Sequence, residues 1–138
     1  MNKMERKIIH VIGTGTIGEP LIGILCEQKS NLGIDEITFH KHSPLTKDKP
    51  KMDNLMKKGA RLSVLEDRVD AFKSIGLEPE FTLEESIARS SVVIDCTPGG
   101  SGLKNKEKYY NKYTDQVKGF LAQGSENGFG KKYARGIN

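Results

Sequence analysis

Three glycines with the spacing Gly-x-Gly-x-x-Gly follow a short apolar run near the start of the chain. The apolar run extends from Ile8 to Ile12, and the glycines are Gly13, Gly15 and Gly18. An amphipathic stretch comes next, so the glycines lie where a buried strand turns into a helix. In such a unit the first glycine permits a tight turn, the second lets a pyrophosphate approach the backbone, and the third lets helix and strand pack closely. The motif predicts a dinucleotide-binding turn, with an ordinary glycine-rich turn as the alternative.

The backbone amides that follow the first glycine would lie at the amino end of the predicted helix. Free N–H groups and the helix dipole both favour negative charge at that position. We therefore expect Gly13, Gly15, Thr16, Ile17 and Gly18 to form the cofactor-binding turn.

Strand and helix patterns alternate from the first strand to residue 122 of this 138-residue chain. This alternation predicts an α/β fold of the Rossmann type, a doubly wound parallel sheet in a three-layer α/β/α arrangement. The expected strands span residues 7–12, 36–40, 61–64, 92–96 and 117–122. The expected helices span residues 17–28, 52–58, 66–75, 83–89 and 105–113. Thr82 and Glu85 have the spacing of a capping box, which marks the start of the fourth helix.

Length and composition are those of one globular domain, with 36% hydrophobic and 29% charged residues. We expect the dinucleotide-binding domain to span residues 1–122, and the glycine-rich segment 123–138 to lead toward a catalytic domain that this chain lacks. No apolar run approaches the about 20 residues of a membrane span. Cys26 and Cys96 have neither disulfide nor metal-ligand spacing. The expectation is a cytoplasmic protein with no metal site and no membrane partner.

The net charge of +4 results from 22 Lys and Arg residues against 18 Asp and Glu residues. Nucleic-acid binding would call for a basic stripe interleaved with aromatic residues, and residues 104–118 come nearest to one. Their tyrosines, Tyr109, Tyr110 and Tyr113, are three and four residues apart and so share one helical face, which packing explains better. We expect no nucleic-acid partner.

The residues that close the second strand bear on the choice between NAD and NADP. NAD-binding domains usually place Asp or Glu about 20 residues beyond the last glycine, where it binds the ribose 2′-hydroxyl. Here that count reaches His40, Lys41, His42 and Ser43, with no acid among them. A 2′-phosphate carries about two negative charges and suits Lys41 and Ser43, with His42 as a further candidate. We expect NADP, or use of both cofactors with a preference for NADP; the alternative is a solvated Lys41 and loose selectivity.

A Thr-Pro-Gly turn ends the fourth strand. Thr97, Pro98 and Gly99 would place backbone groups beside the ribose or nicotinamide, although a purely structural turn is an equal alternative. Asp95 is expected to accept hydrogen bonds from nearby backbone amides rather than to act as a catalytic acid. Cys96 lies in an apolar strand and is expected to pack rather than to react.

The titratable residues form no catalytic or metal-binding set. His10, within the first strand, is expected to be a hydrogen-bonded core residue, and it forms no ligand set with His40 and His42. No pair of residues combines a nucleophile with a general base. No catalytic residue is therefore predicted in this chain.

Five segments occur in the same order as in one known enzyme family. They are Gly-Thr-Gly-Thr-Ile-Gly at 13–18, His-Lys-His-Ser-Pro at 40–44, Lys-Gly-Ala-Arg-Leu-Ser at 58–63, Val-Ile-Asp-Cys-Thr-Pro-Gly at 93–99 and Gln-Gly-Ser-Glu at 123–126. In these segments the chain resembles the archaeal (type II) glyceraldehyde-3-phosphate dehydrogenases.

The resemblance implies that Thr16, Ile17 and Gly124 contact the cofactor. Ser125 stands where the family has a glycine, and residues 99–100 are glycines where the family often has lysines. The family's Ser-Cys-Asn-Thr segment with its nucleophile, its catalytic histidine and its larger substrate domain are not found in this chain. The resemblance thus implies the NAD(P)-binding domain of a phosphorylating dehydrogenase of glycolysis or gluconeogenesis. The parent would be a homotetramer acting on a small molecule, and this chain alone would be inactive.

Two alternatives remain open at this point. A semialdehyde or acyl-phosphate dehydrogenase shares both the cofactor domain and the cysteine chemistry of the family. A stand-alone regulatory module that senses NAD(H) would need the glycine turn but no catalytic residue.

Overall fold

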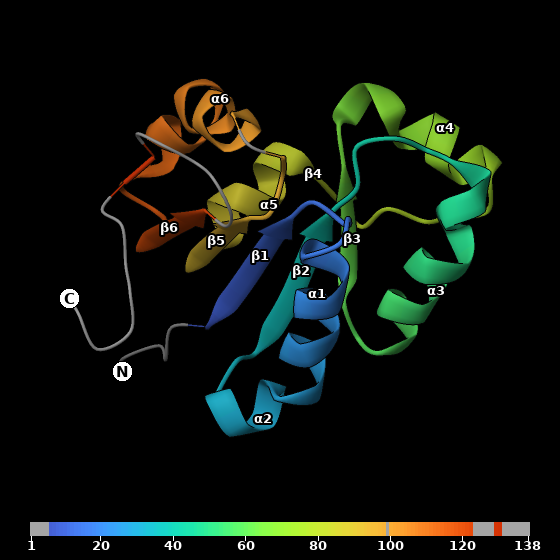
Figure 1. The fold of residues 1–138 in the computed structure, drawn as a ribbon, viewed down its shortest axis with the longest axis horizontal. Coiled ribbons are helices and arrows are strands. Elements are labelled where there is room, and N and C mark those ends of the chain that lie inside the picture. The colour runs from blue at the N-terminus through green and yellow to red at the C-terminus, as the bar shows by residue number, and fades with distance from the viewer. Residues whose placement is uncertain (1–5, 99, 123–128, 131–138) are drawn as a thin grey trace.

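The computed structural model describes residues 6–98, 100–122 and 129–130. These residues form a six-stranded sheet with the order β4-β3-β2-β1-β5-β6, in which every neighbouring pair is parallel (Figure 1). The strands are β1 (Ile8–Ile12), β2 (Glu36–His40), β3 (Arg61–Val64), β4 (Phe81–Thr82), β5 (Val92–Asp95) and β6 (Gly119–Ala122). Strand order reverses between β1 and β5, as in a doubly wound sheet.

Helices cover both faces of this sheet. The α-helices are α1 (Gly18–Glu27), α2 (Lys29–Leu32), α3 (Lys49–Lys57), α4 (Val69–Ser74), α5 (Leu83–Arg89) and α6 (Ser101–Lys108). The 3-10 helices are η1 (Thr46–Asp48), η2 (Glu66–Arg68) and η3 (Tyr110–Tyr113). Side chains of α1, α3 and α4 belong to one core cluster, and side chains of α5 and η3 to another. The predicted three-layer α/β fold is confirmed.

The first core cluster is apolar because one row of strand residues points toward α1 and α3. Val11, Phe39 and Leu62 are partners in register on β1, β2 and β3, and all three are fully buried. They pack with Ile22 of α1 and Leu55 of α3. Burial of these side chains supplies the main favourable term for holding the helices on this face.

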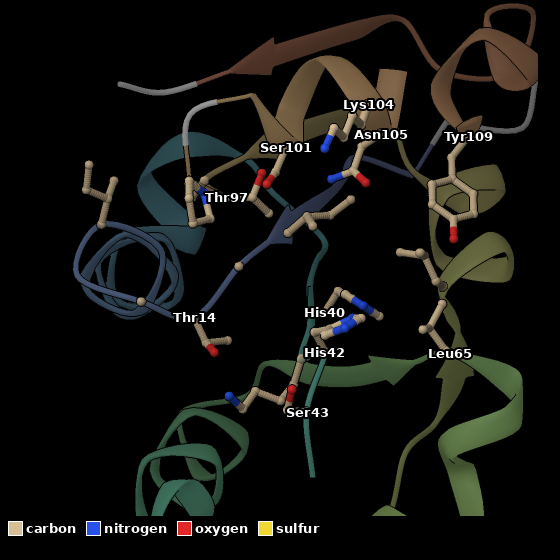
Figure 2. Close-up of a pocket in the computed structure, with 18 of the residues that line it drawn as sticks. Thr14, His40, His42, Ser43, Leu65, Thr97, Ser101, Lys104, Asn105 and Tyr109 are labelled. Carbon is tan, nitrogen blue, oxygen red and sulfur yellow. The ribbon is translucent and has the colours of Figure 1, made fainter. Parts of the chain in front are cut away.

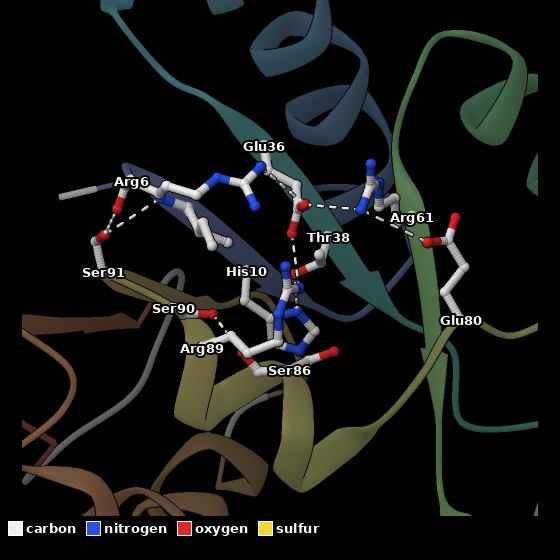
Figure 3. Close-up of polar contacts among 11 residues, drawn as sticks. Arg6, His10, Glu36, Thr38, Arg61, Glu80, Ser86, Arg89, Ser90 and Ser91 are labelled. Atoms are coloured by element: carbon white, nitrogen blue, oxygen red, sulfur yellow. Dashed lines mark hydrogen bonds and ion pairs between the residues drawn. The ribbon is translucent and has the colours of Figure 1, made fainter. Parts of the chain in front are cut away.

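The opposite face of β1, β2 and β3 is polar under α5. His10 Nδ1 lies 2.6 Å from Thr38 Oγ1, and both residues are fully buried (Figure 3). Burial, reinforced by nearby His40, lowers the pKa of His10 to about 3, so this imidazole is neutral at pH 7. The prediction that His10 is a hydrogen-bonded core residue is confirmed.

A buried carboxylate at the start of β2 gathers three arginines (Figure 3). Glu36 is 3% exposed, and its oxygens lie 2.7 Å from Arg89, 2.9 Å from Arg61 and 3.4 Å from Arg6. Burial alone would raise the pKa of Glu36, but the three guanidinium groups outweigh it and the pKa is lowered. Glu36 thus ties Arg6, two residues before β1, the start of β3 and the end of α5 to β2.

Two helices begin earlier than predicted. Helix α3 starts at Lys49 rather than residue 52, since Pro50 fits the first turn of a helix, where its missing N–H is not needed. Helix α6 starts at Ser101 rather than residue 105 because Gly100, with a φ of +88°, turns the chain directly into it. The expected continuous helix 105–113 is wrong: the α-helix ends at Lys108, and η3 follows after Tyr109.

Other local expectations agree with the structure. The side chain of Thr82 accepts from the amide of Glu85 at 3.3 Å, and the Glu85 carboxylate accepts from the amide of Thr82 at 2.9 Å, which is a capping box. Tyr110 is buried and stacks on Phe120, as the packing interpretation of the tyrosines required.

Helix α2, strand β4 and the 3-10 helices were not predicted, and η2 replaces the first turn of the expected helix 66–75. Of the segment expected at 123–138, only Phe129 and Gly130 are described, and Phe129 is buried.

Candidate functional site

A pocket of about 970 Å³ opens at the carboxyl ends of the central strands, where strand order reverses (Figure 2). Ligands of doubly wound proteins bind at this point of the sheet. The lining residues are Ile12, Gly13, Thr14, Gly15, Thr16, Ile17, His40, Lys41, His42, Ser43, Leu45, Leu65, Leu83, Cys96, Thr97, Pro98, Ser101, Lys104, Asn105, Lys108 and Tyr109.

The three glycines of the turn differ in what they contact. A Cβ atom on Gly18 would lie 1.9 Å from the Gly13 carbonyl oxygen, and one on Gly13 would lie 3.0 Å from the Cys96 carbonyl oxygen. Gly13 also has a φ of +106°, which only glycine adopts without strain. A Cβ atom on Gly15 would meet nothing within 4 Å. The fold therefore requires Gly13 and Gly18, whereas at Gly15 the open space leaves room for a ligand.

The amide groups beyond Gly13 are available as donors. Glu19 donates to the carbonyl of Gly15 at 3.1 Å and Leu21 to that of Ile17 at 3.2 Å. Within the described residues, the amides of Gly15, Thr16 and Ile17 donate to no backbone carbonyl, and α1 has no side-chain cap. A ten-residue helix thus presents free N–H groups on the pocket wall.

The loop after β2 forms a second wall, and its Lys41 is mostly buried and paired with a carboxylate. Lys41 Nζ lies 2.9 Å from Asp48 Oδ2, and the two side chains are 14% and 20% exposed. The carbonyl of His42 accepts from Arg68 Nη1 at 2.7 Å. Asp48 and Arg68 were missed in the sequence because they follow Ser43 at distances that no motif fixes.

His40 lies at the floor of the pocket and is 5% exposed. Burial, with nearby His42 as a smaller cause, lowers the pKa of His40 to about 4. Burial also lowers the pKa of His42, with Arg68 and Lys41 adding to the effect. Both imidazoles are therefore mostly neutral at pH 7.

Asp95 organises the end of β5. Its carboxylate, 1% exposed, accepts from the amide of Thr97 at 2.9 Å and from Asn105 Nδ2 at 3.0 Å. The hydroxyls of Thr97 and Tyr110 also donate to it. Burial, together with Asp95, raises the pKa of Tyr110, which therefore stays a donor. Asp95 is a hydrogen-bonded structural acid, as predicted, and it fixes the Thr97 turn against α6.

Cys96 lines the pocket but is not activated. Burial, with a smaller effect of Asp95, raises its pKa to about 11, so the side chain is a thiol at pH 7. Among the described residues, no group of His, Cys, Asp and Glu could hold a metal ion. Nor is any helix in that part of the chain long and apolar enough to cross a membrane.

The pocket brings together most of the predicted cofactor residues. Those that line it are Gly13, Gly15, Thr16, Ile17, Lys41, Ser43, Thr97 and Pro98. Gly18 lies behind the turn, against Gly13, and Gly99 and Gly124 lie outside the described residues.

Helix α6 forms a wall that the sequence did not predict. Lys104 and Lys108 are four residues apart and share one helical face, and both line the pocket (Figure 2 labels Lys104). Their spacing was visible in the sequence, but a helix expected to begin at residue 105 excluded the first of them. Together with Lys41 they give the pocket three lysines, and no Asp or Glu occurs among its described lining residues.

The parallel sheet, its reversal of strand order and the glycine turn at that reversal define a Rossmann-type α/β domain. Comparison with known proteins gives the more particular relationship. The chain is 35% identical over 120 residues to a glyceraldehyde-3-phosphate dehydrogenase of Pyrobaculum arsenaticum. The aligned region covers 86% of this chain and 31% of that enzyme. It is 40% identical over 108 residues to a glyceraldehyde-3-phosphate dehydrogenase of Methanococcoides burtonii, covering 77% of this chain and 30% of that enzyme.

These matches confirm the resemblance to archaeal glyceraldehyde-3-phosphate dehydrogenases that the motifs indicated. The chain spans less than a third of the length of these relatives. No family model matches the chain.

Proposed function

We propose that this chain is the NAD(P)-binding part of a phosphorylating glyceraldehyde-3-phosphate dehydrogenase and that it binds NADP in preference to NAD. The observation that carries this proposal is the pocket at the strand reversal. It combines the free amides of a glycine turn with three lysines and, among the described lining residues, no acid. Such a surface suits a ligand with several phosphate charges.

The pocket walls suggest how a dinucleotide would lie. The amides of Gly15, Thr16 and Ile17 would bind the pyrophosphate, and the space beside Gly15 would admit it. The adenosine ribose would lie at the loop of Lys41 and Ser43. The nicotinamide end would lie at the turn after β5, near Thr97.

The reaction proposed for the whole enzyme follows from the resemblance. Oxidation of an aldehyde there transfers a hydride to the nicotinamide, which is the chemistry that the cofactor supplies when bound. The residues of this chain would bind and orient the cofactor, and Asp95 would hold the Thr97 turn in place. The resemblance further implies a cytoplasmic homotetramer for the whole enzyme, which its native mass in solution would test.

Isothermal titration of the 138-residue chain tests the binding proposal. NADP, NAD and, as a control, nicotinamide mononucleotide are titrated separately. We expect NADP to bind several-fold more tightly than NAD, and the mononucleotide to bind weakly because it lacks the pyrophosphate. Absence of heat with both dinucleotides would overturn the proposal, and equal affinities would overturn the preference.

A further inference from the structure

Lys41, which follows β2 and lines the pocket, is paired with a carboxylate. Lys41 Nζ is 2.9 Å from Asp48 Oδ2. The sequence has no acid at residues 40–43. The fold nevertheless brings Asp48, five residues beyond Ser43, to this loop.

The position of Asp48 is fixed by its own backbone. The amide of Asp48 donates to the carbonyl of Leu45 at 3.0 Å, and the amide of Leu45 donates to that of Ser43 at 2.9 Å. These bonds turn the chain through η1 back toward Lys41. The hydrogen bond from Lys41 is the largest cause of a lowered pKa at Asp48, so this carboxylate is ionised at neutral pH.

The two charges act in opposite directions on a phosphate in the pocket. Lys41 lines the pocket, whereas Asp48 pairs with Lys41 and is not among the described lining residues. Lys47 and Lys51 also face Asp48 electrostatically, but neither lines the pocket. A ribose 2′-phosphate would be attracted by Lys41 and repelled by Asp48, while an uncharged 2′-hydroxyl would feel little of either.

We propose that the Lys41–Asp48 pair sets the choice between NADP and NAD, with Lys41 favouring the 2′-phosphate and Asp48 opposing it. This inference rests on the proposed cofactor site. Asp48 would then be a specificity-determining acid that only the folded chain brings to the site. Removing Asp48 should shift the preference toward NADP, and removing Lys41 should shift it toward NAD.

Titration calorimetry of single and double variants tests the pair through the ratio of the NAD and NADP dissociation constants. Asp48→Asn should raise the preference for NADP by roughly fivefold to tenfold, because one like charge near the phosphate is removed. Lys41→Gln should lower it by at least as much and leave NAD the better ligand. The double variant should return close to the wild-type ratio.

A matched control removes the same charge elsewhere. Asp53 on α3 pairs with Lys49 at 2.6 Å, and neither residue lines the pocket. Asp53→Asn should therefore leave the ratio unchanged within about twofold, since solvent and salt screen an exposed charge that does not line the pocket. Should Asp48→Asn lower the melting temperature, Asp48→Ser provides a second variant without the carboxylate.

The outcomes separate this inference from the proposed function. Binding of both dinucleotides by the wild type, with a ratio that Asp48→Asn leaves unchanged or lowers, would overturn the role of the pair and leave the cofactor site intact. A wild-type chain that binds neither dinucleotide would overturn both.

Discussion

The α-carbon of Gly18 faces the carbonyl oxygen of Gly13 so closely that a Cβ atom on Gly18 would lie 1.9 Å from that oxygen. The end of β1 and the start of α1 are thereby in direct backbone contact. Thr16 and Ile17, in the same turn, line the pocket. Gly15 lies between Gly13 and Gly18 in the sequence but makes no such contact, so its backbone is free to approach a ligand.

Alanine at the two glycines should separate folding from binding. Gly18→Ala should destabilise the chain by about 3 kcal/mol or more, because the backbone itself must move. Gly15→Ala should change stability by less than about 1 kcal/mol and weaken NADP and NAD at least tenfold, since its methyl group would point into the space that the pyrophosphate needs. Urea unfolding and calorimetry measure the two effects. A Gly15→Ala variant that binds as the wild type does would contradict the proposed pyrophosphate position.

Loss of the Glu36 carboxylate should destabilise the fold. Glu36→Gln would leave three arginines around a buried neutral amide. We expect a loss of about 2–3 kcal/mol in the free energy of unfolding, less than for a fully buried pair because the arginines are 28% to 59% exposed. The control is Glu84→Gln, which breaks an exposed pair with Lys112 and should cost less than about 1 kcal/mol. Equal effects of the two variants in urea unfolding would show that the Glu36 cluster is not a structural centre.

Stability should fall in mild acid because of two buried histidines. Their folded pKa values, about 3 for His10 and about 4 for His40, lie below the ordinary value of 6.5. As the pH falls, the unfolded chain therefore takes up protons on these histidines before the folded chain does. The free energy of unfolding keeps its full value above pH 6.5 and decreases as the pH falls toward the pKa values of the folded state. Between pH 6.5 and 4.5 the free energy of unfolding should decrease by up to about 1.4 kcal/mol per pH unit for each histidine. Urea unfolding of wild type and His10→Asn over this range should give a shallower slope for the variant; identical slopes would contradict the assignment.

The lysines of α6 should strengthen binding without choosing between cofactors. Replacing both Lys104 and Lys108 with alanine removes two charges from the pocket wall. We expect NADP and NAD to weaken together, by about threefold to thirtyfold at low salt, with a smaller effect at 0.5 M salt. Lys112→Ala, which removes a charge from η3 outside the pocket, is the control. A change in the NADP-to-NAD ratio would assign these lysines a different position relative to the 2′-phosphate.

The 138-residue chain should bind its cofactor without catalysing aldehyde oxidation. Cys96, with a pKa near 11, holds too little thiolate at pH 7 to attack an aldehyde. We expect no NADPH formation at 340 nm with glyceraldehyde 3-phosphate, phosphate and NADP. NADPH formation that disappears in Cys96→Ser would refute this expectation.

Local patterns predicted the sheet because its strands are short apolar or alternating segments beside turn signals. The five expected strands agree with β1, β2, β3, β5 and β6 within two residues at each end. The two residues of β4 were missed, since so short a strand carries no periodicity. The glycine turn was predictable for a related reason: its spacing reflects the backbone contact between Gly13 and Gly18.

The rest of the site depends on contacts between distant parts of the chain. The start of α6 was misplaced because Gly100 adopts a conformation that composition does not reveal, and with it the wall of Lys104 was missed. The pairing of Lys41 with Asp48 requires the turn through η1, which no count of residues beyond Gly18 can detect. Likewise, sequence could not show whether Lys41 was solvated, and the structure shows that it is largely buried.

We expect the amides after Gly13 to bind the phosphates of a dinucleotide. Amide ¹H–¹⁵N correlation spectra of the chain, recorded during titration with NADP, report on it residue by residue. The largest, saturable shifts should occur at Gly15, Thr16 and Ile17, with further shifts at Lys41 and Ser43. Saturable shifts confined to other residues, or no shifts at millimolar NADP, would contradict it.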